Sequence, residues 1–120
     1  MIFVPVDEAA AFDMFSIFSI KQFYGLAEAE SSLALKTALE QAVGTALCAE
    51  VLASVEYNDL FYANWDMWHI QEKAMRDACP ASYVDRFNQT RYHAKQRLQQ
   101  RFFKQGLQEL KSKRPYEQPV

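Results

Sequence analysis

Glycine, proline and cysteine are scarce in this chain of 120 residues, which contains three, four and two of them. Few glycines and prolines leave few places for turns, so long helices with short connections are favoured. The two cysteines, Cys48 and Cys79, have no metal-ligand spacing and are too few for a disulfide framework. We interpret both as reduced thiols and expect a cytoplasmic protein.

The chain also lacks a long apolar run and a strong net charge. No uninterrupted apolar run approaches the roughly 18 residues of a membrane span, so no membrane association is expected. The first residues include no basic segment and reach the acids Asp7 and Glu8 early, which is unlike a secretory signal peptide. A formal net charge of −2 provides no global field that would attract nucleic acid. Half of the residues are hydrophobic, which is enough for the packed core of one domain.

Charge is distributed unevenly along the chain. The charged residues within 1–60 are mostly acidic, whereas those within 86–114 are mostly basic, with Glu109 as the one acid among them. Antiparallel helices of complementary charge explain this pattern, and a basic surface for an anionic partner is the alternative.

Hydrophobic periodicity predicts helices and no strands. The helices are expected at about 7–24, 29–54, 56–78 and 82–111, the second and third being either separate or one rod bent near Ser54. The first is apolar on more than one face, so it is expected at the centre of the bundle or at a dimer surface. Gly44, inside the second, is expected to mark a close helix crossing. The predicted fold is all-α.

The predicted architecture is an antiparallel bundle of three to four helices with a long C-terminal helix. It comprises a single helical domain over residues 1–112 and a flexible tail over residues 113–120.

The most informative pattern is a polar interruption in one apolar helical stripe. Steps of four and three in the last predicted helix select Val84, Asn88, Arg91, Lys95, Leu98 and Phe102. Such spacing is typical of a face packed against a partner. Two like charges at Arg91 and Lys95 on that face are costly unless they are neutralised. The chain therefore buries a paired polar cluster or opens a small charged pocket there.

The neighbours of this stripe are predicted from the short turn near residues 79–81, which makes the third and fourth helices antiparallel. Glu72 is then expected to neutralise Arg91, and Trp68 to lie over its guanidinium group. Asn64 is expected to contact Lys95. If the first helix docks on these two, Asp13 supplies a carboxylate to Lys95 or Arg91.

The candidate ligand-binding residues are Asp13, Lys21, Asn64, Trp68, Glu72, Asn88, Arg91 and Lys95. Two interpretations stay open. The charged groups fix the helix register without a ligand, or Arg91 and Lys95 hold a phosphate or carboxylate.

Three blocks carry a family resemblance. They are Asp13-x-x-x-Ile17-x-x-Ile20-Lys21, Asn64-x-x-Met67-Trp68-x-x-x-Glu72 and Asn88-x-x-Arg91-x-x-x-Lys95. In this order they resemble the blocks of a family of small, uncharacterised bacterial helical proteins, a domain of unknown function. Lys111-Ser112 is similar to a segment near the end of such chains. The resemblance implies a fold and a residue cluster rather than a reaction.

The sequence offers no catalytic constellation. His69 and Glu72 have a spacing compatible with metal ligation, but the further inward carboxylates of a di-metal bundle are missing, so no metal, cofactor or catalytic residue is predicted. Arg97, Arg101 and Lys104 share the opposite face of the last helix. A solvated face is the usual reason for such a stripe, and nucleic-acid binding is the alternative.

The sequence therefore favours a non-enzymatic helical interaction or accessory protein with an internal polar cluster. Aromatic residues make up 14% of the chain, more than one thin bundle can cover, so a homo-oligomer such as a dimer, or a protein partner, is expected. The alternatives are a small-anion binding protein or enzyme that uses Arg91 and Lys95, and a nucleic-acid-binding protein.

Overall fold

The computed structural model describes residues 2, 4–76, 80 and 82–104. Its helices are α1 (Glu8–Phe23), α2 (Ala29–Val43), α3 (Thr45–Leu52), α4 (Val55–Met75) and α5 (Ser82–Phe102). The described residues contain no strand, so the predicted all-α class is confirmed. No helix in this part of the chain combines the length and the apolar character needed to cross a membrane.

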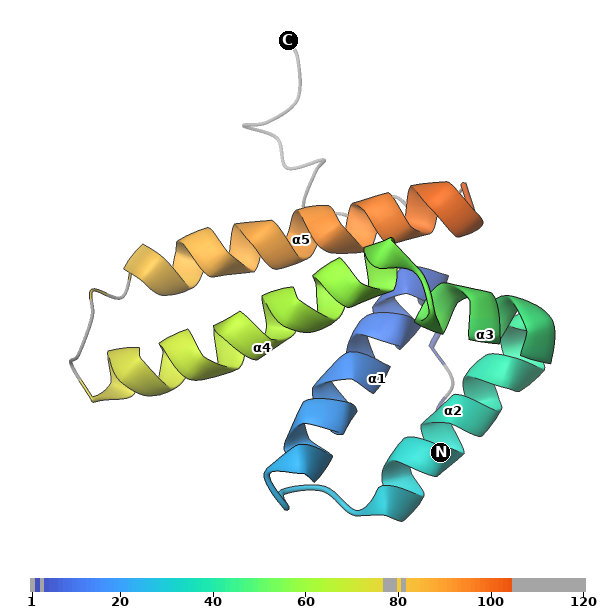
Figure 1. Cartoon of the computed structure of the whole chain (residues 1–120), viewed down its shortest axis with the longest axis horizontal. Coiled ribbons are helices and arrows are strands. Elements are labelled where there is room, and N and C mark those ends of the chain that lie inside the picture. Colours follow the sequence, from blue (N-terminus) through green and yellow to red (C-terminus); the bar gives the residue numbers. More distant parts are fainter. Residues whose placement is uncertain (1, 3, 77–79, 81, 105–120) are drawn as a thin grey trace, which may run out of the picture.

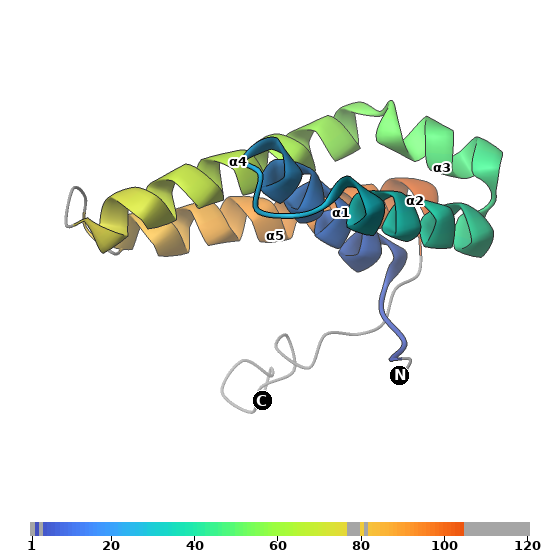
Figure 2. The same ribbon diagram turned by 90° about the horizontal axis from the view of Figure 1, so that it is seen from below.

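The two longest helices, α4 and α5, pack against each other as an antiparallel hairpin (Figure 1). Helix α1 packs against both of its helices and also against α2, so the predicted central position of the first helix is confirmed. Helix α2 lies beside α1, as the view from below shows (Figure 2), and short α3 returns the chain to the start of α4.

Ser54 separates α3 from α4, close to the bend predicted from the sequence. Its hydroxyl donates to the carbonyl oxygen of Val51 at 2.6 Å, and the hydroxyl oxygen accepts the backbone N–H of Tyr57 at 3.1 Å. One side chain thus closes the last turn of α3 and caps the first turn of α4, which is the usual role of serine at a helix N-terminus.

The predicted helix at 29–54 is divided in two at Gly44. This glycine has φ 93° and ψ 147°, a region that side-chain-bearing residues rarely adopt. Its N–H donates to the carbonyl oxygen of Glu40 at 2.8 Å, and its carbonyl accepts from the N–H of Cys48 at 3.0 Å. A Cβ added at Gly44 would meet nothing within 4 Å. The expected close helix crossing is therefore wrong, because glycine is needed here for its backbone angles.

Helix α5 ends at Phe102, earlier than the predicted residue 111. The N–H groups of Phe103 and Lys104 both donate to the carbonyl oxygen of Gln99, at 2.9 and 2.8 Å. Lys104 has φ 62°, the left-handed conformation that commonly closes a helix. The remainder of the predicted helix and the predicted tail at 113–120 lie outside the described residues.

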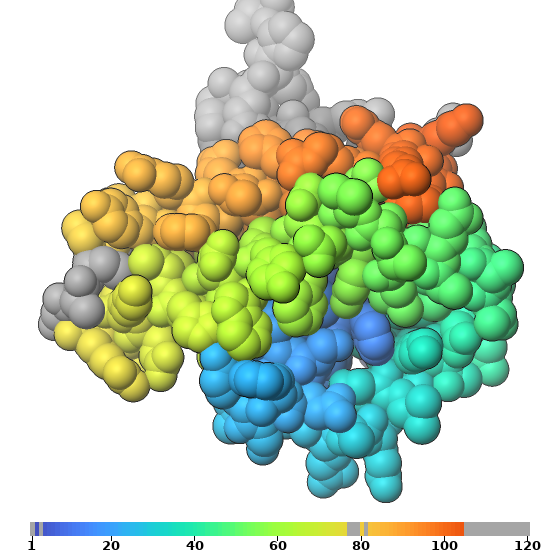
Figure 3. Space-filling view, in the orientation of Figure 1, coloured from blue at the N-terminus to red at the C-terminus, as the bar shows by residue number. Residues whose placement is uncertain are grey.

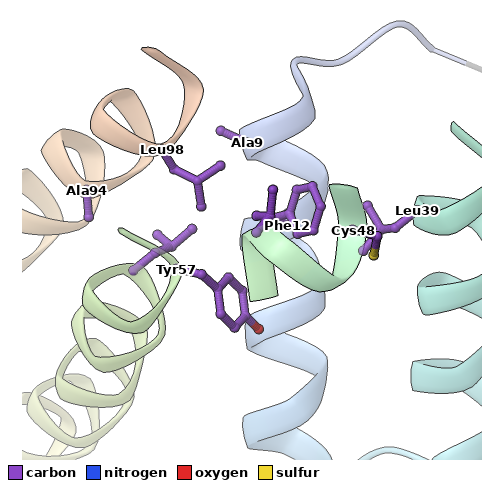
Figure 4. Close-up of a cluster of buried hydrophobic side chains, with 9 residues drawn as sticks. Ala9, Phe12, Leu39, Cys48, Tyr57, Ala94 and Leu98 are labelled. Atoms are coloured by element: carbon purple, nitrogen blue, oxygen red, sulfur yellow. The ribbon is translucent and has the colours of Figure 1, made fainter. Parts of the chain in front are cut away.

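The hydrophobic core forms where α1 crosses the hairpin and α3 closes over it (Figure 4). Phe12 of α1 is fully buried and packs edge-on against Tyr57 of α4, with ring centroids 6.4 Å apart. The buried cluster consists of Ala9, Phe12, Leu39, Cys48, Val51, Tyr57, Leu60, Ala94 and Leu98. Cys48 is thus a buried free thiol, while Cys79 lies outside the described part of the chain.

Candidate functional site

A buried carboxylate joins α1 to both helices of the hairpin. Asp13 on α1 is only 5% exposed. Arg91 on α5 donates to it from Nε to Oδ1 at 3.1 Å and from Nη2 to Oδ2 at 2.6 Å. Asn64 on α4 donates from Nδ2 to Oδ1 at 2.8 Å. Because the guanidinium fork matches the two carboxylate oxygens, this contact fixes both the position and the orientation of α1.

Ser16 completes the network, and the sequence analysis missed it. Its hydroxyl is fully buried, donates to the carbonyl oxygen of Asp13 at 2.7 Å and accepts from Nδ2 of Asn64 at 2.7 Å. The available signal was its position four residues from both Phe12 and Ile20, on the apolar face of the first helix. We call Asp13, Ser16, Asn64 and Arg91 the Asp13 cluster.

Of the predicted site residues, Asp13, Asn64 and Arg91 come together. The carboxylate of Asp13 serves Arg91, which was one of its two predicted partners. The predicted contact between Asn64 and Lys95 is wrong, because the Asn64 amide is turned toward α1. Lys95 is half-buried and forms no ion pair within the described part of the chain.

The predicted pairing of Glu72 with Arg91 is wrong. Glu72 is exposed and accepts from Nη2 of Arg76, one turn along α4, at 3.0 Å. Steps of four residues advance about 40° beyond a full helical turn, so Glu72 has rotated about 80° away from the face that holds Asn64. Asp13 occupies the place beside Arg91 that Glu72 was expected to fill.

Three other predicted site residues lie apart from the cluster. Trp68 stacks on Tyr24 at 6.0 Å, and the cation–π contacts of the described residues do not include one between Trp68 and Arg91. Asn88 is exposed on α5. The ammonium group of Lys21 lies 5.9 Å from the ring centre of Phe18 on the same helix.

The basic face of α5 is partly used within the fold. Arg101 forms an ion pair with Glu56 at the start of α4, and its guanidinium lies 4.7 Å from the ring centre of Phe102. The hydrogen bond from Arg101 lowers the pKa of the Glu56 carboxyl below its usual value. Arg97 and Lys104, the other two nucleic-acid candidates, are exposed.

The end of α1 (light blue) lies against the middle of α4 (yellow-green) in the space-filling view (Figure 3), and Phe23 and Trp65 are in contact there. The ring of Tyr24 stacks on Trp65 at 5.7 Å and on Trp68 at 6.0 Å. His69 Nδ1 lies 2.7 Å from the carbonyl oxygen of Trp65, and its Nε2 lies 2.7 Å from the Tyr24 hydroxyl. Since a carbonyl only accepts, Nδ1 carries the proton of the neutral ring and Nε2 accepts from Tyr24.

The outer side of these rings is exposed. Phe23 packs against Trp65 at 5.4 Å, yet 72% of its surface remains accessible. Leu26 is 64% exposed and Tyr62 is 54% exposed. We call the exposed Phe23, Tyr24, Leu26 and Tyr62, together with the half-buried Trp65, the aromatic surface, since Leu26 is its one non-aromatic member.

The residues that the structure describes include no group of three or more His, Cys, Asp or Glu side chains placed to hold a metal ion. Comparisons of the chain with protein-family models, with curated proteins and with solved structures give no significant match. The resemblance to a bacterial helical family therefore stays a prediction.

Proposed function

We propose that this protein is a non-enzymatic helical interaction protein, in which the Asp13 cluster holds α1 in place and the aromatic surface docks a second copy of the chain. The observation that carries the structural role of the cluster is that both oxygens of the buried Asp13 carboxylate are engaged. Both carboxylate oxygens accept hydrogen bonds from side chains of other helices.

These hydrogen bonds favour a structural role for the cluster over anion binding. A phosphate or carboxylate ligand that replaced Asp13 as the partner of Arg91 would leave a buried carboxylate without its cationic partner. Breaking such a pair by removing one partner costs about 3–5 kcal/mol. The ligand would have to supply that free energy before it gained any net affinity.

The aromatic surface supports the interaction role. Contiguous exposed apolar groups on a single chain mark docking sites, and aromatic residues are enriched at the centres of such interfaces. A second copy of the chain presents the same rings, so the two copies cover each other's aromatic surface around a twofold axis. We further propose that the protein acts in the cytoplasm, which agrees with the free thiol of Cys48.

The two interpretations of the cluster are separated by a thermal-shift measurement with inorganic phosphate. We expect phosphate to leave the melting temperature of the wild type unchanged, apart from a salt effect that sodium chloride of equal ionic strength reproduces. Specific stabilisation of the wild type that disappears in Arg91→Ala would instead establish an anion site.

Docking through the aromatic surface is tested by light scattering during size-exclusion chromatography. The wild type is expected to run with twice the 13.9 kDa chain mass and Phe23→Asp with the chain mass. Met75→Asp is the matched control, since Met75 is also apolar and is 87% exposed, against 72% for Phe23, but lies at the far end of α4. A wild type that stays monomeric at high concentration, or equal effects of the two substitutions, would contradict this arrangement.

A further inference from the structure

The basic residues in and just after α5 are not balanced by acids. The stretch 86–104 contains Arg86, Arg91, Lys95, Arg97, Arg101 and Lys104 and no aspartate or glutamate. The chain as a whole has more acidic than basic residues, 15 against 13. Positive charge is therefore concentrated on this helix, although the net charge of the whole chain is slightly negative.

Much of this charge lies on one side of α5. Steps of three and four residues place it on the side opposite the buried Ala94, Leu98 and Gln99. In Figure 1, α5 runs along one edge of the molecule, with the other helices together on one side of it. We call the exposed positions on the opposite side the outer face of α5: Arg86, Gln89, His93, Gln96, Arg97 and Gln100.

The unmixed charge of the outer face is unlike that of an ordinary solvated surface, which carries both signs. Helix α4 is of the ordinary kind, since Glu72 and Arg76 form an ion pair one turn apart. Neither Arg86 nor Arg97 has an acid three or four residues away, and Arg97 instead has Arg101 one turn along. Like charges at this spacing lower the stability of a helix, and a partner of opposite charge offsets that loss.

The cations available to such a partner are Arg86, Arg97 and Lys104. All three are exposed, and the ion pairs within the described part of the chain involve none of them, whereas Arg101 is held by Glu56. Arg86 and Arg97 lie about 16 Å apart along the helix axis. Because a nucleic acid duplex carries one negative charge per about 1.7 Å, the same length of duplex presents about ten phosphates.

The scarcity of exposed apolar groups on α5 disfavours a lipid surface. Tyr83, in the first turn, is the one exposed large hydrophobic residue of α5 in the described part of the chain, and the guanidinium of Arg86 lies 5.3 Å from its ring centre. A helix that binds in a membrane interface inserts an apolar face. The apolar side of α5, with Ala94 and Leu98, is instead packed into the core against α4 and α1.

The amide side chains of the outer face favour duplex DNA. Gln89, Gln96 and Gln100 lie among the cations, and amides bond to phosphate and sugar oxygens and to base edges. The major groove of B-DNA, about 12 Å wide, admits one side of an α-helix, whereas the deep groove of A-form RNA excludes side chains. An acidic protein partner fits less well, because the centres of protein interfaces are apolar and depleted of charge.

We propose that the outer face of α5, together with Lys104, binds duplex DNA mainly through its phosphate backbone and with little sequence preference. Arg86, Arg97 and Lys104 contact phosphates, and the glutamines face the groove between them. This inference uses neither the Asp13 cluster nor the aromatic surface, so it stands or falls independently of the proposed function.

The test is fluorescence anisotropy of a labelled DNA duplex titrated with the full chain, up to about 100 μM protein and at potassium chloride concentrations from about 50 to 200 mM. We expect the affinity to fall steeply with salt. The slope of log K against log salt should be about −2.7, which is about −0.9 for each of the three cations.

The deciding variant combines Arg86→Gln with Arg97→Gln. At about 100 mM salt it should bind DNA about tenfold or more weakly than the wild type, and its slope should shrink to about −0.9. The matched control combines Lys36→Gln with Lys73→Gln, which removes the same charge from exposed positions on α2 and α4 and should change neither quantity appreciably. Because all four side chains are exposed, both variants should melt close to the wild type.

Arg86→Lys combined with Arg97→Lys keeps the charge, so it should retain most of the affinity and the full slope. The proposal is overturned if the duplex is not bound at the lowest salt, if the two glutamine variants weaken binding equally, or if the slope stays the same without Arg86 and Arg97. Tighter binding to an RNA duplex of the same sequence, or to vesicles that contain phosphatidylserine, would also overturn it and assign the outer face to that polyanion.

Discussion

At the scale of single residues, Arg91 is the group that joins the Asp13 carboxylate of α1 to α5. Arg91→Ala would leave the Asp13 carboxylate buried with Asn64 as its one remaining side-chain donor among the described residues. We expect the free energy of unfolding to fall by about 3 kcal/mol, the low end for a broken buried pair, because Arg91 itself is partly exposed. Urea denaturation followed by circular dichroism measures this change.

The matched control is Arg97→Ala on the exposed side of the same helix, which should change stability by no more than about 0.5 kcal/mol. Arg91→Lys should recover only part of the loss, because an ammonium group cannot reproduce the two parallel hydrogen bonds of the guanidinium. Equal losses for the two alanine variants would show that the Asp13 cluster contributes nothing specific to stability.

The sequence predicted the centre of this cluster but not its boundary. Arg91 was recognisable because a cation on an apolar stripe requires a counter-charge, and Asp13 because it shares a helix face with isoleucines. Ser16 was missed although it lies four residues from both Phe12 and Ile20, because serine is common at exposed positions and only its place on the apolar face indicated burial. Glu72 was placed wrongly because positions four residues apart drift around the helix, and a local partner, Arg76, was available one turn away.

At the scale of helices, Gly44 determines where α2 ends and α3 begins. We expect Gly44→Ala to lower the free energy of unfolding by about 1–3 kcal/mol, as measured by urea denaturation, because alanine is strained at φ 93° and ψ 147°. A Cβ at this position meets no neighbouring atom, so the loss would come from the backbone alone.

Gly25→Asn serves as the comparison for Gly44→Ala. Gly25 has φ 71°, which asparagine tolerates, and it also has free space for a Cβ. Gly25→Asn should lower the free energy of unfolding much less than Gly44→Ala does. A Gly44→Ala protein as stable as the wild type would mean that α2 and α3 can merge into one helix without cost.

The ion pair between Glu56 and Arg101 links the start of α4 to the end of α5 and should respond to acid. The pKa of Glu56 is lower in the folded protein than its usual value of 4.5, mainly because of the hydrogen bond from Arg101. A lowered folded pKa gives stability that is present above pH 4.5 and is lost as pH falls through the folded value. We expect the difference in melting temperature between the wild type and Glu56→Gln to shrink below about pH 4.5. A difference that stays constant from pH 7 to pH 3 would contradict this assignment.

Hydrophobic periodicity predicted the helices well and their interruptions poorly. Leu39, Val43, Leu47 and Val51 continue one apolar stripe across Gly44, so the period alone gives no sign of the break. The end of α5 was missed for a related reason. A left-handed lysine stops it, and lysine carries no sequence signal for that conformation.

At the scale of the whole molecule, the buried side chains gather toward one end of the α4–α5 hairpin. Helices α1 and α3 cover α4 up to Met67 and α5 from Ala94 onward, and every buried residue of the hairpin lies in these two stretches. The described residues at 68–76 and 82–93 are exposed or half-buried. In the stretches 68–76 and 82–93, α4 and α5 pack mainly on each other and bury little apolar surface. Most of the stability is therefore concentrated in the half of the hairpin that α1 and α3 cover.

This gradient of burial along the hairpin predicts that the hairpin opens without global unfolding at its tip, the end where α4 finishes and α5 begins. In hydrogen–deuterium exchange measured by mass spectrometry, amides at 70–76 and 84–90 should exchange much faster than those at 57–67 and 95–101, because local opening costs less where few apolar contacts must be broken. Arg91→Ala should accelerate exchange in both groups, since it loosens α1 from the covered half of the hairpin. Uniformly slow exchange along the whole hairpin would contradict the gradient. It would show that the tip is protected as well as the core. The tip would then replace the aromatic surface as the candidate site for a partner.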